Sequence, residues 1–261
     1  MEISAYIPCH NGAATLQRAI EGVRRQPVAE FFVVDDGSTD GSAKIAEAAG
    51  VRVIRLDRRT GRGACRARAM AEARHPVVLS CDAAIFLPPD FVARAVKWIE
   101  QENAAAVCGF ITQQEARNAV DRWRGRHLLR APGAFSGQGS FVTAAALLRA
   151  DLAAEAGGYD AGHEHGEDAD LGRRLLARGR KVIYDPELIA WQIGSNSMGR
   201  VLERYWRWNR AGGRLTFARY IKQIHFAVTV MARQDMETAD VGAALISLVS
   251  PHYQYWRDLW E

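Results

Sequence analysis

The chain has few cysteines, no long apolar run and almost no excess charge. Four cysteines occur without CxxC spacing or paired histidines: Cys9, Cys65, Cys81 and Cys108. This argues against a zinc site and, in the absence of a signal peptide, predicts a reducing, cytoplasmic environment. No apolar run approaches the roughly 18 residues that a membrane span needs. The longest, 225–232 and 241–249, are short and flanked by charge, so we expect a soluble protein.

The formal charge of +4 is too small to argue for nucleic acid as a partner. About half of the residues are apolar (48%) and a quarter are charged (25%), which is ordinary for a soluble globular protein. At 261 residues the chain is long enough for one large α/β domain or for a domain with a helical appendage.

The first half alternates between strand and helix patterns. Short apolar runs predict strands at 3–7, 31–34, 51–54 and 77–79, and helical patterns lie between them at 14–26, 42–49 and 62–74. This alternation predicts βαβ units and a parallel sheet. Ligands bind such sheets at the carboxyl ends of the strands. Polar motifs begin at these ends, so we expect them to meet in one site.

Four motifs follow one another along the chain: AYIPCHNG (5–12), FVVDDGSTDGS (32–42), LSCDAAIFLPPDF (79–91) and GEDADLGRRLLARG (166–179). In this order they resemble the family 2 glycosyltransferases, over about residues 3–214. The resemblance implies a GT-A fold with a mostly parallel central sheet. It also implies inverting transfer of one sugar from a nucleoside diphosphate sugar, with a UDP-sugar favoured. The acceptor would be a hydroxyl of a glycan, a lipid-linked sugar or a small molecule.

Asp35 and Asp36 end a predicted strand and precede Gly-Ser-Thr-Asp-Gly. By itself this pattern is typical of a turn and a helix cap. The resemblance instead assigns these acids to the nucleotide, with Asp36 favoured as the contact to the base and Pro8 near it.

The segment 58–69 carries five arginines. Arg66 falls where the family places an arginine that reaches the nucleotide, although Ala67 replaces the usual neighbouring Asn. The alternative is that these arginines only cover an exposed helix face.

Two positions depart from the family's metal site. The family's Asp-x-Asp aligns with Asp82-Ala83-Ala84, so Asp82 is retained as a ribose or sugar contact while Ala84 replaces the metal ligand. Gln192 stands where many members have a metal-binding His. A methyl group cannot ligate Mg²⁺ or Mn²⁺, so we expect metal dependence to be weak or dispensable. His163 and His165 are alternative ligands, or else surface residues.

Glu167 and Asp168 stand at the start of an apolar pattern with helical spacing. By itself this position is also typical of acids that only compensate the dipole of a helix. The preceding residues 154–168 match the family's approach to its catalytic base. The resemblance therefore assigns Asp168 as the general base with Glu167 beside it, and we expect burial to raise the pKa of Asp168.

The Gly- and Arg-rich segment 122–141 suits an acceptor-facing wall or a plain surface loop. Arg204, Arg207 and Trp208 form an Arg-x-x-Arg-Trp sequence where processive members have Gln-x-x-Arg-Trp. We interpret this as a non-processive relative, in which these residues contact the diphosphate or the acceptor. The alternative is a helix with one aromatic side packed inward.

We divide the chain into a glycosyltransferase domain at 1–215 and a helical extension at 216–261. Within the domain, 1–100 forms the nucleotide half and 101–215 the acceptor half. Apolar residues of the extension repeat at helical spacing: Phe217, Tyr220, Ile221, Ile224 and Val228. Three interpretations of the extension stay open: docking on the core, a homodimer surface, or peripheral contact with the inner face of a membrane. An alternative function is a weak or inactive relative that binds a nucleotide or sugar as a partner subunit.

Overall fold

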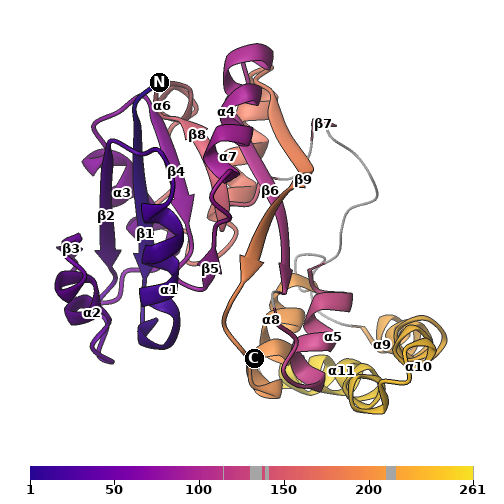
Figure 1. Cartoon of the computed structure of the whole chain (residues 1–261). Coiled ribbons are helices and arrows are strands. Elements are labelled where there is room, and N and C mark those ends of the chain that lie inside the picture. Colours follow the sequence, from indigo (N-terminus) through magenta and orange to yellow (C-terminus); the bar gives the residue numbers. More distant parts are fainter. Residues whose placement is uncertain (114, 130–136, 139–140, 210–215, 261) are drawn as a thin grey trace. The chain divides into compact units, whose positions relative to one another are not determined.

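The computed structural model describes residues 1–113, 115–129, 137–138, 141–209 and 216–260. It forms two compact units (Figure 1). The first comprises Met1–Thr112 and Ala131–Gly194, and the second comprises Gln113–Arg130 and Ser195–Glu261. The domain boundary predicted at residue 215 lies outside the described residues.

The first unit begins with the predicted alternation of strands and helices. In chain order its elements are β1 (Ile3–Cys9), α1 (Ala13–Arg24), β2 (Glu30–Asp35), α2 (Ser42–Ala48), β3 (Arg52–Arg55), α3 (Arg62–Glu72) and β4 (Val77–Cys81). The strands lie in the order β3-β2-β1-β4, and all of these pairs are parallel. The α/β prediction is therefore confirmed, and each predicted strand matches an observed one to within two residues at either end.

After β4 the regular alternation ends. The following elements are β5 (Ile85–Phe86), α4 (Phe91–Glu102), β6 (Ala106–Gln113), β7 (Gly137–Gln138), β8 (Ala145–Arg149), α6 (Ala150–Glu155), α7 (Glu167–Ala177) and β9 (Val182–Gln192). The sheet continues in the order β8-β6-β9-β5, and β8 joins β4 antiparallel. The sheet is thus mixed: the predicted parallel arrangement holds for its first four strands, and antiparallel pairs complete it.

Both faces of the parallel half are buried. In β1, Ile3, Ala5 and Ile7 enter the larger core, while Tyr6 enters a second core on the opposite face. Side chains alternate between the faces of a strand, so one strand supplies both cores. Helix α3 covers the second face with Cys65 and Ala69. This packing places Arg66, the residue after Cys65, beside the sheet.

The second unit is helical. Its elements are α5 (Ala119–His127), α8 (Met198–Asn209), α9 (Phe217–Phe226), a π-helical segment η2 (Ala227–Ala232), α10 (Arg233–Glu237) and α11 (Val241–Leu259). Trp123 is fully buried at its centre and packs with residues of α8, η2 and α11. The indole of Trp123 meets Tyr205 edge to face, with ring centroids 5.4 Å apart.

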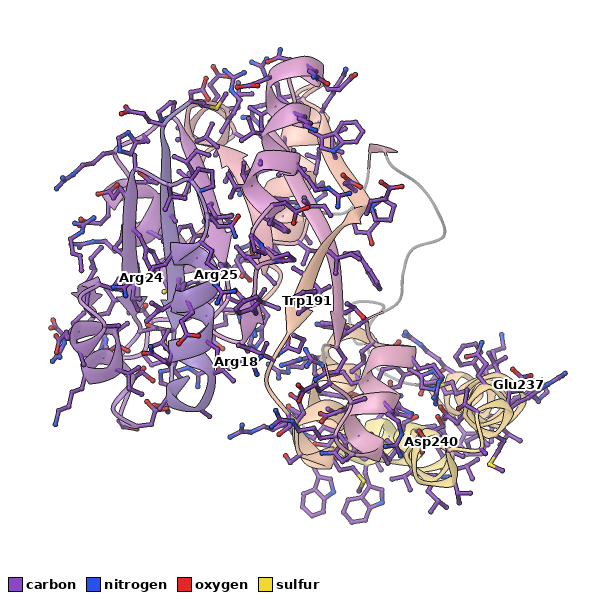
Figure 2. The ribbon with its side chains drawn as sticks, in the orientation of Figure 1. Arg18, Arg24, Arg25, Trp191, Glu237 and Asp240 are labelled. Carbon is purple, nitrogen blue, oxygen red and sulfur yellow. The ribbon has the colours of Figure 1, made fainter. Side chains whose placement is uncertain are left out.

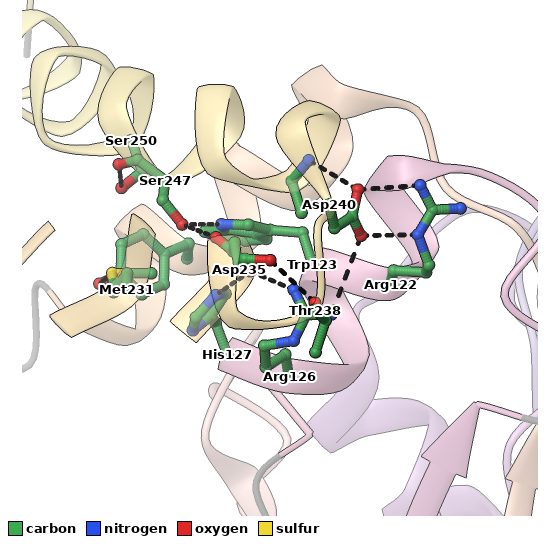
Figure 3. A network of polar contacts seen from close by, with 12 residues as sticks. Arg122, Trp123, Arg126, His127, Met231, Asp235, Thr238, Asp240, Ser247 and Ser250 are labelled. Carbon is green, nitrogen blue, oxygen red and sulfur yellow. Dashed lines mark hydrogen bonds and ion pairs between the residues drawn. The ribbon is translucent and has the colours of Figure 1, made fainter. Parts of the chain in front are cut away.

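Asp235 organises a buried polar network in this unit (Figure 3). It is fully buried, forms an ion pair with Arg126 and accepts a hydrogen bond of 2.6 Å from Ser247 Oγ. His127 Nε2 lies 2.9 Å from the same carboxylate, and Trp123 Nε1 donates to Ser247 Oγ at 2.8 Å. These bonds connect α5, α10 and α11, so the network defines how the helices pack.

Helix α9 forms where the sequence predicted it, but the described residues cover its apolar side chains only in part. No residue of α9 is buried, and Phe217 is 66% exposed. Among the residues that the structure describes, no helix is both long and apolar enough to cross a membrane.

Candidate functional site

The loops that follow β1 and β2 are joined by hydrogen bonds. The amide of Asp36 donates to the carbonyl of Cys9 at 2.8 Å, and that of Asn11 donates to Ser38 Oγ at 2.9 Å. Asp40 Oδ2 accepts from the amide of Ala13, the first residue of α1, at 2.9 Å. These hydrogen bonds therefore hold together the loops at the carboxyl ends of β1 and β2. Pro8 lies near the end of β1, paired with Val34 of β2.

The carboxylate of Asp36 holds the loop between β3 and α3. It accepts from the amide and hydroxyl of Thr60, at 2.6 and 2.7 Å, and from the amide of Gly61 at 3.0 Å. The next residue, Gly37, has φ +65°, and a Cβ there would lie 2.7 Å from the backbone of Arg58 and Arg59. Only glycine fits this close approach, so the loop 58–61 lies against the end of β2.

Asp35 has a spare acceptor. Its Oδ2 accepts weakly from the amide of Ser38 at 3.3 Å, while its buried Oδ1 has no hydrogen-bond partner among the described residues. A buried acceptor without a partner costs roughly 1–3 kcal/mol. Of the two acids predicted to meet the nucleotide, Asp35 therefore has an oxygen to offer, whereas Asp36 already accepts three bonds.

Arg66 is the centre of the site. It is 3% exposed, and its guanidinium donates to Asp82 Oδ1 at 2.7 Å and to Glu167 Oε1 at 3.0 Å. It also donates to Ser80 Oγ at 2.8 Å and to the hydroxyl of Tyr6 at 3.3 Å. One buried side chain of α3 thus joins β1, β4 and the first turn of α7. The structure brings together three predicted site residues that are far apart in the sequence.

The charges in this cluster are strongly coupled. Burial by itself lowers the pKa of Arg66, but the carboxylate of Asp82 and the groups around it raise that pKa well above its ordinary value. Burial also raises the pKa of the Tyr6 and Tyr159 hydroxyls, so both stay neutral. Arg66 is therefore a permanent cation whose charge is already balanced by Asp82 and Glu167.

Glu167 and Asp168 lie in different surroundings. Glu167 is 2% exposed and points to Arg66, whereas Asp168 is half-buried. Asp168 accepts from its neighbour's amide, that of Ala169, at 2.9 Å and weakly from the amide of Thr143 at 3.4 Å. Asp168 is therefore the acid of the pair that is partly accessible and forms no ion pair with a described residue.

The two positions at which we predicted that a metal ligand is replaced, Ala84 and Gln192, lie next to each other. Ile85 pairs with Gln192 across β5 and β9, and the carbonyl of Ala84 accepts from the amide of Ile193 at 2.9 Å. Their side chains are a methyl group and a neutral amide, and Asp82 is bonded to Arg66. No group of three acids, histidines or cysteines suited to a metal occurs among the described residues. This donor set does not fit a divalent ion held by protein side chains.

Aromatic contacts fix β5 beside β9. Phe86 stacks on Trp191 with ring centroids 5.8 Å apart, and the guanidinium of Arg25 lies 5.6 Å from the Phe86 centroid. Figure 2 labels Arg25 near the end of α1 and Trp191 on β9. These contacts hold Ala84 and Gln192 in register.

The remaining predicted residues lie in the loop before α7 and on α8, and the carbonyl of His163 accepts from the amide of Gly63, in the first turn of α3, at 2.9 Å. His163 Nδ1 is 3.0 Å from Asp160 Oδ2, and His165 is exposed in the same loop. Arg204, Arg207 and Trp208 belong to the second unit, on α8, where Trp208 is 55% exposed. Burial first, and then Arg204, lower the pKa of the buried Arg124 to about 9. Part of the predicted acceptor wall at 122–141 lies outside the described residues.

Comparison with known proteins shows the family of the chain. The family model described as "Glycosyl transferase family 2" matches residues 4–154, more than half of the chain. The chain belongs to this family. An N-acetylglucosaminyltransferase of Mesorhizobium japonicum is 25% identical over 94% of this chain and 63% of its own length. The succinoglycan biosynthesis protein ExoU of Rhizobium meliloti is 30% identical over 76% of this chain and 64% of its own length. This chain thus spans just under two thirds of both relatives.

Solved structures show the same fold. The mannosyltransferase PcManGT from Pyrobaculum calidifontis, in complex with GDP-Man and Mn²⁺, superposes with a TM-score of 0.63 at 17% identity. The match covers 95% of this chain and 73% of that one. TarS 1–349 of S. aureus gives a TM-score of 0.59 at 13% identity, over 99% of this chain and 88% of its own. The predicted GT-A fold is therefore confirmed for this member of family 2.

The sequence reasoning missed polar residues that bond the candidate site residues. Ser80 and Tyr6 bond Arg66, Thr60 bonds Asp36, and Thr143 bonds Asp168. A signal existed for Ser80, because it lies two residues before Asp82 and residues i and i+2 of a strand share a face. Thr143 gave no such signal, since its contact joins the segment before β8 to the first turn of α7, 25 residues along the chain.

Proposed function

We propose that this protein is an inverting, non-processive glycosyltransferase that transfers one sugar from a nucleoside diphosphate sugar, with a UDP-sugar favoured, to a hydroxyl acceptor. One observation carries the proposal most directly: Arg66 holds Glu167, at the start of α7, against Asp82 at the end of β4. The acid pair and the donor motif therefore share one site. The two relatives reported above, named as a sugar transferase and a polysaccharide biosynthesis protein, support a glycan acceptor.

Asp168 suits the general base. It is partly accessible, unlike Glu167, and the Thr143 amide orients its carboxylate. In the transfer, the acceptor hydroxyl gives its proton to Asp168 while its oxygen bonds to the anomeric carbon of the sugar. The bond from that carbon to the diphosphate breaks on the opposite face, and the nucleoside diphosphate leaves with the electron pair. Attack opposite the leaving group inverts the anomeric centre.

The diphosphate needs a cation other than Arg66, because two carboxylates already surround that guanidinium. Three arginines of the neighbouring loop and helix start are exposed and form no ion pair with described residues: Arg58, Arg59 and Arg62. The bonds of Asp36 to Thr60 and Gly61 hold this loop at the end of β2. Guanidinium groups bind phosphate oxygens in bidentate fashion. These arginines would therefore stabilise the leaving diphosphate where the family's metal ligands are replaced.

Asp35 would meet the nucleobase. Its unpartnered Oδ1 can accept an N–H of the base, whereas the Asp36 carboxylate is used in holding the loop. Asp82 stays the proposed ribose contact, oriented by Arg66. Arg204, Arg207 and Trp208 stay proposed contacts to the diphosphate or the acceptor.

Replacement of the base tests the transfer chemistry. Asp168→Asn keeps the size of the side chain but cannot take a proton. We expect kcat to fall by the ~10²–10⁴ that is typical of a lost general base. The affinity for UDP, measured by calorimetry, should barely change. Turnover close to that of the wild type would exclude Asp168 as the base.

The diphosphate contact has a separate test. We expect Arg59→Ala with Arg62→Ala to weaken UDP binding by about tenfold or more, since a hydrogen bond to a charged group contributes roughly 1.5–3 kcal/mol. Uridine, which lacks phosphate, should bind both proteins equally. Arg68→Ala is the matched control, because Arg68 is an exposed arginine of α3 that already pairs with Glu72. Equal losses for UDP and uridine would contradict the assignment.

A second candidate is a catalytically weak or inactive relative that binds a nucleotide or sugar as a partner subunit. The replacement of both metal positions, by Ala84 and Gln192, favours it. Retention of the acid pair favours the enzyme. Hydrolysis or transfer from a panel of nucleotide sugars, with and without EDTA, distinguishes the two: binding without turnover of any donor would support the second candidate.

A further inference from the structure

Gly63 lies in the first turn of α3 and packs directly against the loop that precedes α7. Its amide donates to the carbonyl of His163 at 2.9 Å. A Cβ at this position would lie 2.1 Å from the carbonyl oxygen of Asp160 and 2.6 Å from that of His163. Both distances are far shorter than a van der Waals contact, so only glycine lets the backbone of the loop come this close. We call residues 160–163 the turn.

The side chain of Asp160 gives the turn a defined shape. Its Oδ1 accepts from the amide of Gly162 at 2.8 Å, and its Oδ2 lies 3.0 Å from His163 Nδ1. The amide of His163 also donates to the carbonyl of Asp160 at 3.1 Å. The first three residues of the turn are nevertheless exposed. The turn is therefore a compact piece of surface that rests on α3 through Gly63.

Helix α3 contacts the segment 160–167 at both of its ends. Gly63 meets the turn, and Arg66, three residues later, donates to Glu167 Oε1 at 3.0 Å. Residues three apart lie on the same side of a helix, so one face of α3 carries both contacts. Asp168 directly follows Glu167. The position of the proposed base therefore depends on how this face of α3 holds the segment before it.

The donor side of the proposed site is fixed to the same end of α3. The carboxylate of Asp36 accepts from the amides of Thr60 and Gly61, the two residues before the helix, at 2.6 and 3.0 Å. Cys65 and Ala69 bury α3 against the sheet. The first turn of α3 is thus a rigid support between the donor loop and the turn.

We propose that Gly63 is a positioning residue for the transfer reaction: by admitting the turn against α3, it sets the place of Asp168 relative to the donor. This inference rests on the proposed function, in which Asp168 takes the proton of the acceptor hydroxyl. The acceptor and the leaving diphosphate lie on opposite sides of the anomeric carbon, so the distance of the base from the donor decides how well the hydroxyl is aligned. A misplacement of about 1 Å, caused by a change remote from the chemistry, can lower a rate by ~10²-fold.

Two glycine substitutions with the same steric effect test the proposal. Gly63→Ala places a Cβ 2.1 Å from the carbonyl oxygen of Asp160, and the exposed turn must move away because α3 is buried against the sheet. Gly109→Ala is the matched control, since its Cβ would lie 2.0 Å from the carbonyl oxygen of Leu188, between β6 and β9. We expect kcat to fall ~10-fold or more in Gly63→Ala, with the donor KM within about twofold of the wild type. Per folded molecule, counted by circular dichroism, Gly109→Ala should keep the wild-type kcat.

Asp160→Ala reaches the same contact from the other side and leaves α3 unchanged. It removes both side-chain contacts that shape the turn, and the protein should fold because Asp160 is exposed. We expect it to lower kcat, as Gly63→Ala does, without weakening UDP binding. Hydrogen exchange measures the contact itself. The amides of residues 160–166 should exchange faster in both variants and at the wild-type rate in Gly109→Ala.

Three results would overturn the proposal. Equal loss of kcat per folded molecule in the Gly63 and Gly109 variants would make the loss a general effect of strain in the unit. A UDP affinity that falls as much as kcat would place the role of Gly63 in donor binding. Faster exchange of residues 160–166 with unchanged kcat would show that the turn does not position the base. Failure of the proposed function is distinguishable from all three, because Asp168→Asn would then keep turnover close to that of the wild type.

Discussion

Removal of the Arg66 guanidinium should destabilise the first unit far more than removal of an exposed arginine. Arg66→Ala deletes four hydrogen bonds, two of them to carboxylates. Asp82, whose side chain is 34% exposed, can regain water and contributes little to the loss. The side chain of Glu167 is only 2% exposed and cannot regain water, so it would remain buried without a cation. Breaking such a buried pair costs about 3–5 kcal/mol.

The loss should depend on pH. In the variant, Glu167 would be a buried carboxylate without a cation, and burial disfavours the charged form of such a group. A carboxyl with a raised folded pKa destabilises the protein at pH values above its unfolded pKa, and the penalty disappears once the group is protonated in both states. The stability difference between wild type and variant should therefore be largest near neutral pH and shrink as the pH falls towards about 4.

Urea unfolding at neutral and acidic pH measures both effects. The matched control is Arg68→Ala on the same helix, where an exposed pair with Glu72 contributes at most about 1 kcal/mol. Glu167→Gln in the Arg66→Ala background removes the stranded charge and should recover part of the loss. Equal destabilisation by the Arg66 and Arg68 variants, or a pH-independent difference, would refute the reasoning.

Two further substitutions probe the second unit and the metal positions. Asp235→Ala should destabilise the helical unit by about 3–5 kcal/mol, because the buried partners of that carboxylate would lose their acceptor. Glu237→Ala is the exposed control. Similar thermal unfolding midpoints for the two variants would contradict the role of the network. Wild-type nucleotide binding should be insensitive to EDTA, whereas Ala84→Asp with Gln192→His should make calorimetric UDP affinity rise with Mn²⁺. A wild type that binds UDP only with Mn²⁺, or an unresponsive double variant, would show that the ion is held differently.

Local patterns in the sequence were sufficient for the first half of the fold. Apolar runs ended by Pro8 or Asp35 predicted β1 and β2, because a buried strand must be apolar and its end must turn. The alternation of strands with helices predicted parallel pairing, since right-handed βαβ crossovers bring successive strands side by side. The same argument placed the acids at the carboxyl ends, where the structure has them.

The second half of the sheet depended on tertiary packing. β8 pairs antiparallel with both β4 and β6 near the centre of the sheet. The sequences of β6 and β8 do not alternate with helices in a way that predicts which strand lies beside them. Likewise, the helical spacing in α9 predicted an apolar and a polar face. It could not predict which segment packs on the apolar face, because the spacing of apolar residues carries no information about the neighbouring element.

The composition of the site shows the same division. The resemblance of the motifs to the family identified Asp168 as a candidate base and Arg66 as a candidate donor-site residue. Only the tertiary structure decided that Arg66 bonds Glu167, 101 residues away, and that Asp36 holds a loop while Asp35 retains a spare oxygen. Sequence patterns show which hydrogen bonds and charges each side chain can supply. Whether a donor or acceptor already has a partner depends on side chains that meet only when distant segments pack. Only the folded structure can therefore show which groups remain available to a ligand.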